Sequence, residues 1–343
     1  MSSYSSHWIA VDFLGKGPVV PGSSLGRILQ TWCDHVYQFV DCRQTRLYKK
    51  LEGANFMRSK LFVPASRPEL FEKAARSEAD AISFDLEDAV DEARKHEARA
   101  VLSAHLEAPR THDKLVLVRV NALATEHFKQ DVEAIVRTGL DVINLPKIES
   151  PEEILAALSH IELCEARHGI TEPIRILANI ETPAGLQNAS ASAAAHPRVM
   201  GLQIGFGDLF APLGIRQSNS FAIAQTRWSV RIAAAQAGID AFDGAFVNIS
   251  APDDFVADAQ AARAMGFTGK SCIHPSQLRL ANEVFRPTPD ELAHAVDVTR
   301  AAADAGARAV GAFVVNGQLV DGPFITRAQR IVEQARRDGL LVD

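Results

Sequence analysis

The sequence is poor in the features that mark several large classes of protein, beginning with cysteine. Only four cysteines occur in 343 residues, and none belongs to a Cys-x-x-Cys pair. Disulfide scaffolds and zinc sites depend on closely spaced cysteines, whereas scattered ones are typical of free thiols in a reducing compartment. We therefore expect neither a disulfide framework nor a zinc site. The four thiols are Cys33, Cys42, Cys164 and Cys272.

An excess of positive charge and long apolar runs are missing as well. The formal net charge is −6, which predicts no basic surface for nucleic acid or for an anionic membrane. No run reaches the roughly eighteen apolar residues of a membrane-spanning helix, and no basic segment followed by an apolar core marks a secretory signal. We predict a cytoplasmic protein that binds neither nucleic acid nor membranes. Its hydrophobic content of 47% is typical of a folded globular chain.

Residues 1–55 lack the regular alternation of strand and helix patterns found in the rest of the chain. They are irregular, and we find no chemistry in them. A helical spacing of apolar residues predicts one amphipathic helix there, formed by Leu25, Ile28, Leu29, Trp32, Val36 and Phe39. We predict three parts, which are an N-terminal extension of unknown role at 1–55, a catalytic barrel at 56–285 and a C-terminal helical segment at 286–343.

From residue 58 onward, short apolar segments alternate with helical patterns. The expected strands are Lys60–Pro64, Ala81–Leu86, Lys114–Asn121, Val142–Pro146, Arg175–Ile180, Val199–Ile204, Gly244–Ile249 and Gly269–His274. Parallel neighbours need a crossover helix between them, so the alternation predicts a parallel sheet. Eight is also the number of strands that closes a (β/α)₈ TIM barrel. An open doubly wound sheet is the alternative, yet no G-x-G-x-x-G motif follows the first strand.

Helices are expected between these strands and after the last of them. Those between strands are Pro68–Ser77, Asp91–Leu106, Pro151–His168 and Asp253–Met265. The C-terminal segment adds an alanine-rich helix at about Pro289–Ala307, an apolar stretch at Val310–Val315 and a last helix from Pro323. This segment is too large to be a simple cap of the barrel.

Charged and polar residues follow nearly every expected strand. Barrel enzymes carry their chemistry at the C-terminal ends of the strands, and a purely structural face would not need so many charges there. We therefore expect an active site on that side. The residues at these strand ends are Ser66, Arg67, Asp85, Glu87, Asp88, Arg119, Asn121, Lys147, Glu149, Glu181, Asp208, Asn248 and His274.

Two of these carboxylates, Glu181 and Asp208, follow neighbouring strands and offer a pair of hard oxygen ligands. Magnesium typically takes one or two carboxylates and leaves positions open for substrate oxygens, of which an α-keto acid supplies two. Arg119 beside the pair is suited to bind a substrate carboxylate or an enolate oxygen through its planar fork. The pattern predicts a magnesium site.

Each of these residues also has a purely structural explanation. Asp208 precedes an apolar segment and resembles a helix N-cap, so only its neighbours favour the metal. Glu181 is followed by Thr182 and Pro183, an adequate N-cap and first helical residue, which frees Glu181 for another role. His274–Pro275 is typical of the start of a helix.

Lys147 and the acidic segment at 85–88 have alternatives of their own. A Schiff-base lysine needs a desolvated pocket, and the carboxylates expected nearby favour an ion-paired Lys147 instead. Strand alternation puts Asp85 and Glu87 on one face and Asp88 on the other, so the three are not all metal ligands. We predict that Asp85 and Glu87 serve catalysis by orienting metal-bound water and Arg119.

Eight segments together resemble a known family. They read KLFVPASRPELFEKAA, FDLEDAVDEARKHEAR, LVRVN, LPKIESPEE, NIETPAG, IGFGDLFAPLG, GFTGKSCIHPSQL and NGQLVDGPFITRAQ. In this order and spacing they resemble the citrate lyase β-subunit-like family, with its malyl-CoA and citramalyl-CoA lyases, within the HpcH/HpaI aldolase and phosphoenolpyruvate/pyruvate superfamily. The resemblance covers roughly Arg58 to Gln334 and implies a TIM barrel, usually in trimers or hexamers.

The resemblance implies roles for residues in the middle motifs. Glu181 of the E-T-x-A-G motif and Asp208 of the G-x-x-D-L motif match the magnesium ligands of the family. Arg119 of the R-V-N motif matches the arginine that contacts the keto-acid product and its metal. Many members carry a glutamate just before the metal aspartate, where this chain has Gly207. The loss of that acid puts substrate shape and metal affinity in doubt, as do the less familiar residues 216–225, which we expect on a loop near the substrate.

The first and last motifs imply a thioester site. Phe62, Arg67 and Lys73 match positions that hold coenzyme A, where an aromatic wall suits adenine and two cations suit phosphates. Packing inside the barrel is the alternative for Phe62. Asp321 of the G-x-L-V-D motif matches a carboxylate that family members insert into a neighbouring subunit's site, to exchange a proton with the carbon beside the thioester. The resemblance therefore implies a homotrimer or homohexamer.

The implied activity is that of a magnesium-dependent carbon–carbon lyase. It cleaves or forms a short 3-hydroxy-acyl-CoA such as malyl- or citramalyl-CoA, with an α-keto acid and an acyl-CoA as the other side of the reaction. One alternative is a citrate lyase β subunit that acts on a citryl thioester of an acyl carrier protein. Others are a class II aldolase for a free hydroxy-keto acid, against which Asp321 argues, and a non-catalytic scaffold, against which the complete set of site residues argues.

Overall fold

The computed structural model describes residues 57–307 and 311–341, which lie within one compact unit. The predicted N-terminal extension and its amphipathic helix lie outside the described residues, as do Cys33 and Cys42. Cys164 and Cys272 are buried and free, as expected. The boundary between barrel and C-terminal segment, set at residue 285, stays a prediction.

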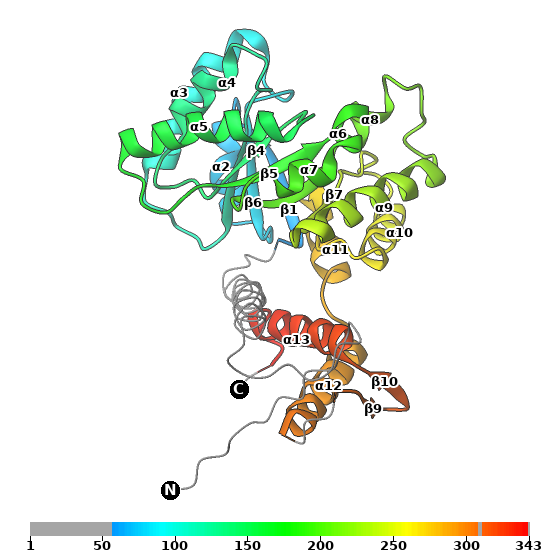
Figure 1. Cartoon of the computed structure of the whole chain (residues 1–343). Helices are drawn as coiled ribbons and strands as arrows, with labels where there is room; N and C mark the ends of the chain where they lie inside the picture. Colours follow the sequence, from blue (N-terminus) through cyan, green and yellow to red (C-terminus); the bar gives the residue numbers. More distant parts are fainter. Residues whose placement is uncertain (1–56, 308–310, 342–343) are drawn as a thin grey trace, which may run out of the picture. The chain divides into compact units, whose positions relative to one another are not determined.

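Eight parallel strands close into a barrel in the order of the sequence (Figure 1). Each strand pairs with the next, and β8 pairs with β1 through Lys60 and Ser271, which excludes an open sheet. The predicted TIM barrel is therefore confirmed. The strands are β1 (Ser59–Pro64), β2 (Ala81–Asp85), β3 (Leu115–Arg119), β4 (Val142–Leu145), β5 (Arg175–Ile180), β6 (Val199–Ile204), β7 (Asp240–Asp243) and β8 (Gly269–Cys272).

Helical segments connect the strands and cover the barrel. Capping residues explain several of their ends, as where Ser150 caps α5 at its start and Gly169, with a φ of 66°, ends it. The elements between β1 and the C-terminal segment are η1 (Pro68–Leu70), α2 (Phe71–Ala75), η2 (Glu92–Arg94), α3 (Lys95–Glu107), α4 (His127–Ile135), α5 (Pro151–His168), α6 (Pro183–Gln187), α7 (Ala189–Ala194), α8 (Phe206–Phe210), α9 (Ser220–Ala237), α10 (Pro252–Ala264) and α11 (Ser276–Val284).

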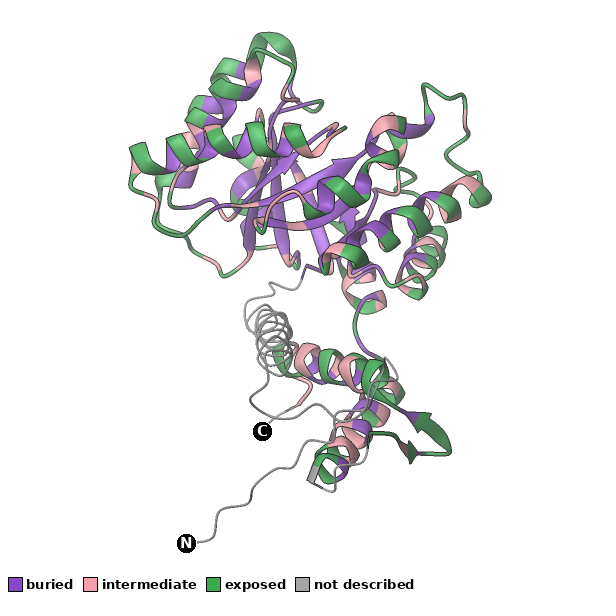
Figure 2. Cartoon of the chain, in the orientation of Figure 1, coloured by how far each residue is buried: buried purple, intermediate pink, exposed green. Residues whose placement is uncertain are grey.

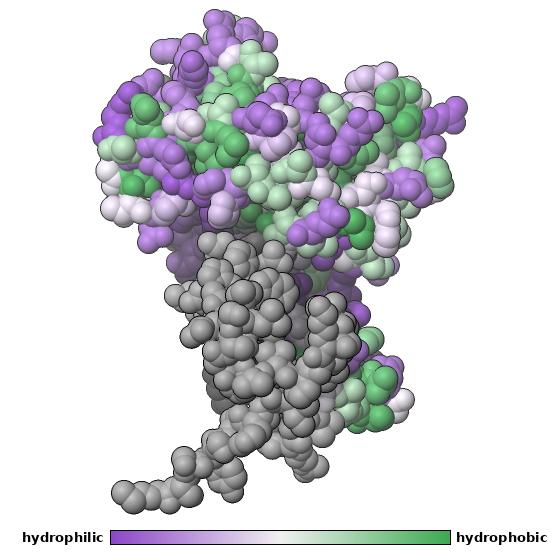
Figure 3. Space-filling model, in the orientation of Figure 1, coloured by the Kyte–Doolittle hydropathy of each residue, from purple (hydrophilic) through white to green (hydrophobic). Residues whose placement is uncertain are grey.

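The strands are buried on both faces (Figure 2), which is why they read as nearly continuous apolar runs. Outward-facing residues such as Ile82 and Val118 pack against the helices in the main core. Inward-facing residues such as Leu117, Val142 and Leu177 form a second cluster in the barrel interior. Hydrophilic and hydrophobic residues intermix over the barrel face seen in Figure 3. Among the described helices, none is both long enough and apolar enough to cross a membrane.

The prediction for the seventh strand is wrong. The strand expected at Gly244–Ile249 forms at Asp240–Asp243, and Asn248 lies in the turn that follows. Acidic residues are unusual in strands, so the apolar segment after β7 was the better match to a strand pattern. Asp243 is tolerated because it is buried against Arg227 and Lys270. The loop expected at 216–225 is also partly wrong, since its last six residues open α9.

The C-terminal segment has a small core of its own. Helix α12 (Pro289–Ala307), the hairpin of β9 (Phe313–Val315) and β10 (Gln318–Val320), and helix α13 (Gly322–Arg337) surround it. Both helices were expected, and the predicted apolar stretch contributes β9. The second strand was missed because it is only three residues long, although the Asn316–Gly317 turn, with both φ angles positive, is typical of a tight hairpin.

Candidate active site

Arg119 is fixed at the end of β3 by acids from β2 and the loop after it. Its guanidinium binds Asp85 through two nitrogens, with Nε–Oδ1 and Nη2–Oδ2 distances of 2.8 and 2.6 Å. Its third nitrogen lies 3.0 Å from Glu87 Oε2. Asp85 also accepts from the backbone N–H groups of Glu87 and Ala89, so both of its oxygens are fully used. Asp85 therefore orients Arg119, as predicted from the sequence.

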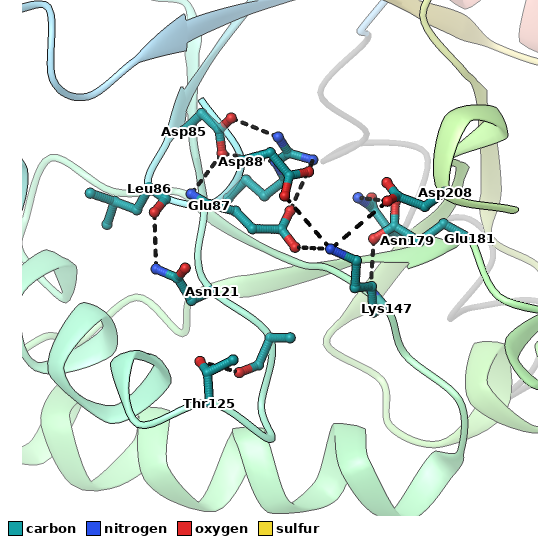
Figure 4. A network of polar contacts seen from close by, with 12 residues as sticks. Asp85, Leu86, Glu87, Asp88, Asn121, Thr125, Lys147, Asn179, Glu181 and Asp208 are labelled. Atoms are coloured by element: carbon teal, nitrogen blue, oxygen red, sulfur yellow. Dashed lines mark hydrogen bonds and ion pairs between the residues drawn. The ribbon is translucent and has the colours of Figure 1, made fainter. Parts of the chain in front are cut away.

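Lys147 links the acids of β2 to those of β5 and β6 (Figure 4). Its ammonium lies 2.7 Å from Glu87 Oε1, 3.7 Å from Asp88 Oδ1 and 4.0 Å from Asp208 Oδ1. These carboxylates raise the pKa of Lys147 although burial opposes them, so the predicted ion-paired lysine is confirmed. The expectation that Asp88 points away is wrong, because β2 ends at Asp85 and strand alternation does not extend to residue 88.

Glu181 is buried at the end of β5 and is held from two sides. Its Oε1 accepts the backbone N–H of Lys147 at 2.7 Å, and its Oε2 accepts from Asn179 Nδ2 at 3.4 Å. Lys147 presents that N–H from a left-handed backbone conformation, with a φ of 50°, which is uncommon for a residue other than glycine. Thr182 caps α6 through the N–H of Gly185, as expected, so Glu181 is free of capping.

Asp208 lies across from Glu181 on the short helix α8, which follows β6. It belongs to the first turn of that helix but makes no capping hydrogen bond, so the N-cap alternative is wrong. Its side chain is 42% exposed, in contrast to Glu181, which is buried. Gly205, between β6 and α8, is required here, because any side chain would overlap the carboxylate of Glu181.

Negative charge exceeds positive charge among these residues. Burial, together with the charges of Glu87 and Asp208, raises the pKa of Glu181 from 4.5 to about 7, although Arg119 and Lys147 act against it. Burial is also the main cause that raises the pKa of Glu87. A further cation at this place would relieve the repulsion between the carboxylates.

The donors fit a magnesium ion. Glu181 and Asp208 offer hard carboxylate oxygens after neighbouring strands, and one oxygen of Glu181 is fixed by a backbone N–H. Within the described residues no group of three or more His, Cys, Asp or Glu side chains forms a ready-made metal cage. Magnesium does not need one, since it usually takes one or two carboxylates and completes its shell with water and substrate oxygens. The raised pKa of Glu181 indicates that a cation is favoured there.

The three residues matched to coenzyme A lie in different surroundings. Arg67 is exposed and paired with Glu69, and Lys73 is exposed on α2. Phe62 instead packs between two cations, with its ring centroid 4.2 Å from Lys60 Nζ and 5.1 Å from the guanidinium carbon of Arg119. The ring of Phe62 thus packs against Lys60 and Arg119, and its role at coenzyme A stays a prediction.

Asp321 stands before the first residue of α13 and is exposed. None of the hydrogen bonds or ion pairs of the described residues joins its side chain to the acids at the strand ends. Asp338 follows the other end of α13. It pairs at 3.1 Å with Arg58, the residue before β1. A helix of sixteen residues is about 24 Å long, so Asp321 lies far from that contact.

Two other polar residues at the strand ends, Asn121 and His274, have structural partners. Asn121 binds the Leu86 carbonyl and Asp131, and so joins β2 to α4. His274 accepts the N–H of Ser276 at the start of α11, which confirms the structural explanation given for it. Sequence reasoning missed Lys60 and Asn179, which lie inside the barrel beneath the site. The sequence offered one indication: Lys60 lies two residues before Phe62 in an otherwise apolar strand, so both face the same side.

Comparison with known proteins gives a consistent result. A family model described as HpcH/HpaI aldolase/citrate lyase matches residues 58–275. The citrate lyase subunit beta of Haemophilus influenzae is 34% identical, over 81% of this chain and 97% of that protein. The L-malyl-CoA/beta-methylmalyl-CoA lyase of Cereibacter sphaeroides is 36% identical, over 81% of this chain and 94% of that protein. The structure of protein CitE from Mycobacterium tuberculosis in complex with magnesium, acetoacetate and coenzyme A has a TM-score of 0.65 at 33% identity, and the match covers 82% of this chain and 99% of that one.

Proposed function

Because the chain belongs to the HpcH/HpaI aldolase/citrate lyase family, we propose that it is a magnesium-dependent carbon–carbon lyase. It cleaves or forms a short 3-hydroxy-acyl-CoA such as malyl- or citramalyl-CoA, with an α-keto acid and an acyl-CoA as the other side of the reaction. The observation that carries the proposal is Arg119, locked by Asp85 and Glu87 beside the carboxylate pair of Glu181 and Asp208.

Glu181 and Asp208 are the proposed magnesium ligands. The metal, when bound, supplies Lewis-acid stabilisation of the negative charge that develops on the oxygens of the keto acid. Arg119 binds the carboxylate of the hydroxy-acid end, and its fixed orientation means that little reorganisation is needed as charge develops. Asp85 is a positioning residue for Arg119, because none of its oxygens is left for substrate.

The cleavage needs one proton acceptor and one proton donor. The hydroxyl proton leaves, the carbon–carbon bond breaks, and its electron pair passes to the carbon beside the thioester, which then takes up a proton. Burial raises the pKa of Glu87, whose two oxygens lie beside Lys147 and Arg119, and we assign it the hydroxyl proton. Asp321 delivers the proton to the carbon, or removes it in the reverse condensation.

We further propose that Asp321 acts in the site of a neighbouring copy, within a homotrimer or homohexamer. The exposed position of Asp321 supports this, as do the apolar side chains exposed around it. Val314 and Leu319 on the hairpin are 67% and 66% exposed, and Phe324 on α13 is 55% exposed. Exposed apolar residues on a hairpin and on the helix that follows it are typical of a surface that a partner covers.

Coenzyme A is the proposed carrier of the acyl group. The printed names of relatives divide between malyl-CoA lyase and citrate lyase subunit beta, and the CitE complex contains coenzyme A. Arg67 after β1 and Lys73 on α2 are both exposed, and two cations suit the phosphates of coenzyme A. The alternative is the citryl thioester of an acyl carrier protein. A cytoplasmic location, where acyl-CoA is available, completes the proposal.

The experiment is a panel of malyl-, methylmalyl-, citramalyl- and citryl-CoA, assayed for release of acetyl-CoA or propionyl-CoA with magnesium or with EDTA. Wild type is compared with Asp208→Ala, and with Glu149→Gln as a control carboxylate that follows β4 outside the site. We expect magnesium-dependent cleavage of one thioester, which Asp208→Ala abolishes and Glu149→Gln retains. No cleavage of any thioester, with activity on a free hydroxy-keto acid, would overturn the proposal.

A further inference from the structure

A layer of buried polar side chains lies inside the barrel, among residues that face its axis. Six such residues are each at most 3% exposed. Barrel interiors are usually filled by branched apolar residues, and this barrel follows that rule in its second apolar cluster. The polar layer is therefore a departure that needs an explanation. Its members are Lys60, Ser83, Asn144, Asn179, Gln203 and Ser271.

Lys60 is the unexpected member of this layer. It lies on β1, is 1% exposed, and has its ammonium over the face of Phe62. Burying a lysine is costly, and burial lowers the pKa of Lys60 well below its usual value, while Arg119 lowers it further and Asp85 and Glu181 oppose the change. No carboxylate of the described residues forms an ion pair with it. A purely structural position would more naturally carry an apolar side chain of the same length.

A chain of amides leads from Lys60 to Glu181. The amide of Asn144 satisfies its neighbours in one orientation only, in which its oxygen accepts from Lys60 Nζ at 3.0 Å. Its nitrogen then donates to Asn179 Oδ1 at 2.7 Å and to the Leu177 carbonyl at 3.2 Å. Asn179 in turn donates to Glu181 Oε2 at 3.4 Å. Every donor in the chain therefore points from Lys60 toward Glu181.

We propose that Lys60 is a positioning residue that, through Asn144 and Asn179, holds Glu181 in the orientation that binds magnesium. Lys60 offers donors to Asn144, so the oxygen of Asn144 faces it and the nitrogen faces Asn179. That polarity leaves Asn179 with its nitrogen toward Glu181. The second oxygen of Glu181 is thus fixed by a side chain, while Lys147 fixes the first by its backbone N–H. The inference rests on the proposed function, because it concerns the same magnesium site.

The chain matters to the metal because partners behind a ligand set the ligand's direction and charge. Loss of such a partner typically weakens metal affinity or activity about 10- to 100-fold. Hydrogen bonds in series also polarise one another, so a donor at the far end strengthens the last bond. If an apolar side chain replaces Lys60, the oxygen of Asn144 has no donor to face. The amide of Asn144 is then free to rotate, and Asn179 can no longer be held with its nitrogen toward Glu181.

The test is direct magnesium binding to the metal-free protein, by calorimetric titration without substrate, together with the melting temperature. Lys60→Met keeps the length of the side chain but removes its donor. We expect magnesium binding to weaken about tenfold or more. The melting temperature should stay the same or rise, because the desolvation cost of a buried lysine is removed. Lys60→Gln, which keeps an N–H donor, should retain most of the affinity. Ser271→Ala, in the same layer but outside the chain, should leave it unchanged.

A double-mutant cycle separates the amide chain from a direct effect of charge. Asn144→Leu breaks the chain in the middle, so adding Lys60→Met to it should weaken magnesium binding no further. Additive losses, or unchanged binding in Lys60→Met, would overturn the inference and leave the proposed function intact. A wild-type protein that binds no magnesium, or that binds it equally well after Asp208→Ala, would instead overturn the metal site itself.

Discussion

The barrel holds two networks of charged side chains that differ in their balance. The wall network lies between the strands and the helices outside them, and consists of Arg227, Lys270, Asp243 and Asp258. Each of its two cations contacts both of its acids, at distances from 2.5 to 2.9 Å. Lys270 and Arg227 lower the pKa of Asp258, although burial alone would raise it. This network is complete as it stands.

The mouth network, at the C-terminal ends of the strands, is not balanced in this way. It consists of two cations, Arg119 and Lys147, and five acids, which are Asp85, Glu87, Asp88, Glu181 and Asp208. Here burial and like charges raise the pKa of Glu181 and of Glu87. The contrast teaches that burial of charge alone does not mark a function. An uncompensated excess of one sign does, because it prepares a place for an ion or substrate of the other.

The largest expected difference between the two networks is in activity. Glu181→Gln keeps the shape of the side chain but removes a proposed magnesium ligand. Loss of metal stabilisation worth about 4 kcal/mol corresponds to a fall in kcat/KM of about a thousandfold. Steady-state cleavage of the preferred thioester measures it. Glu149→Gln, which follows β4 and lies outside both networks, serves as the control. Activity of Glu181→Gln near the wild-type value would remove the basis of the contrast.

The wall network should respond in stability instead. Asp243→Asn leaves Arg227 and Lys270 buried with only Asp258 to share, and removing one partner from a buried network costs about 3 kcal/mol or more. Urea unfolding measures the loss. Asp208→Asn removes one negative charge from a network that has too many, and the side chain is 42% exposed. This variant should therefore change the free energy of unfolding by no more than about 0.5 kcal/mol. Equal losses in the two variants would mean that the networks do not differ.

Much of this arrangement was predictable because local signals agreed with the fold. Helix α5 was predicted to the residue, since a serine cap, a proline at the first helical position and a glycine after the last all mark its ends. Glu181, Asp208 and Arg119 were expected near one another because the ends of parallel strands meet on one face of a barrel. Neither inference needed knowledge of a distant contact.

What the sequence concealed depends on partners far along the chain. Strand β7 was missed because Asp243 finds its cations sixteen residues earlier and twenty-seven residues later in the chain, which no local pattern reveals. Asp88 was placed on the wrong face because the strand stops three residues before it. Lys60 gave no functional signal, since a single lysine in a strand is usually exposed at an edge. Its burial follows only from closure of the barrel.

The imbalance at the mouth predicts a pH dependence of stability in the metal-free protein. The pKa of Glu181 is about 7 in the folded state against 4.5 unfolded, so the folded state holds the proton more tightly. This stabilisation of about 3 kcal/mol is fully present below pH 4.5 and is lost as the pH rises through 7. Urea unfolding from pH 5 to 8 in EDTA measures it as the difference between wild type and Glu181→Gln.

Magnesium should reverse this effect at the mouth and leave the wall network unaffected. At pH 8 the ion binds only the folded state, so above its dissociation constant it should raise the melting temperature of wild type with the logarithm of its concentration. Asp243→Asn, although less stable, should gain as much from magnesium as wild type, and Glu181→Gln should gain little. The same pH slope in wild type and Glu181→Gln would show that Glu181 is not the group that titrates.

The smallest expected effect tests the geometry of the mouth rather than its charge. Arg119→Lys keeps one positive charge, so the balance of the network and the stability of the fold should change little. A lysine ammonium is a point charge, and it cannot bind both oxygens of Asp85 and reach Glu87 at once, as the fork of Arg119 does. We expect kcat/KM to fall about tenfold, equivalent to about 1.4 kcal/mol, with magnesium affinity nearly unchanged. If magnesium binding fell as much as activity, Arg119 would serve the network by its charge, and its fixed orientation would have no separate role.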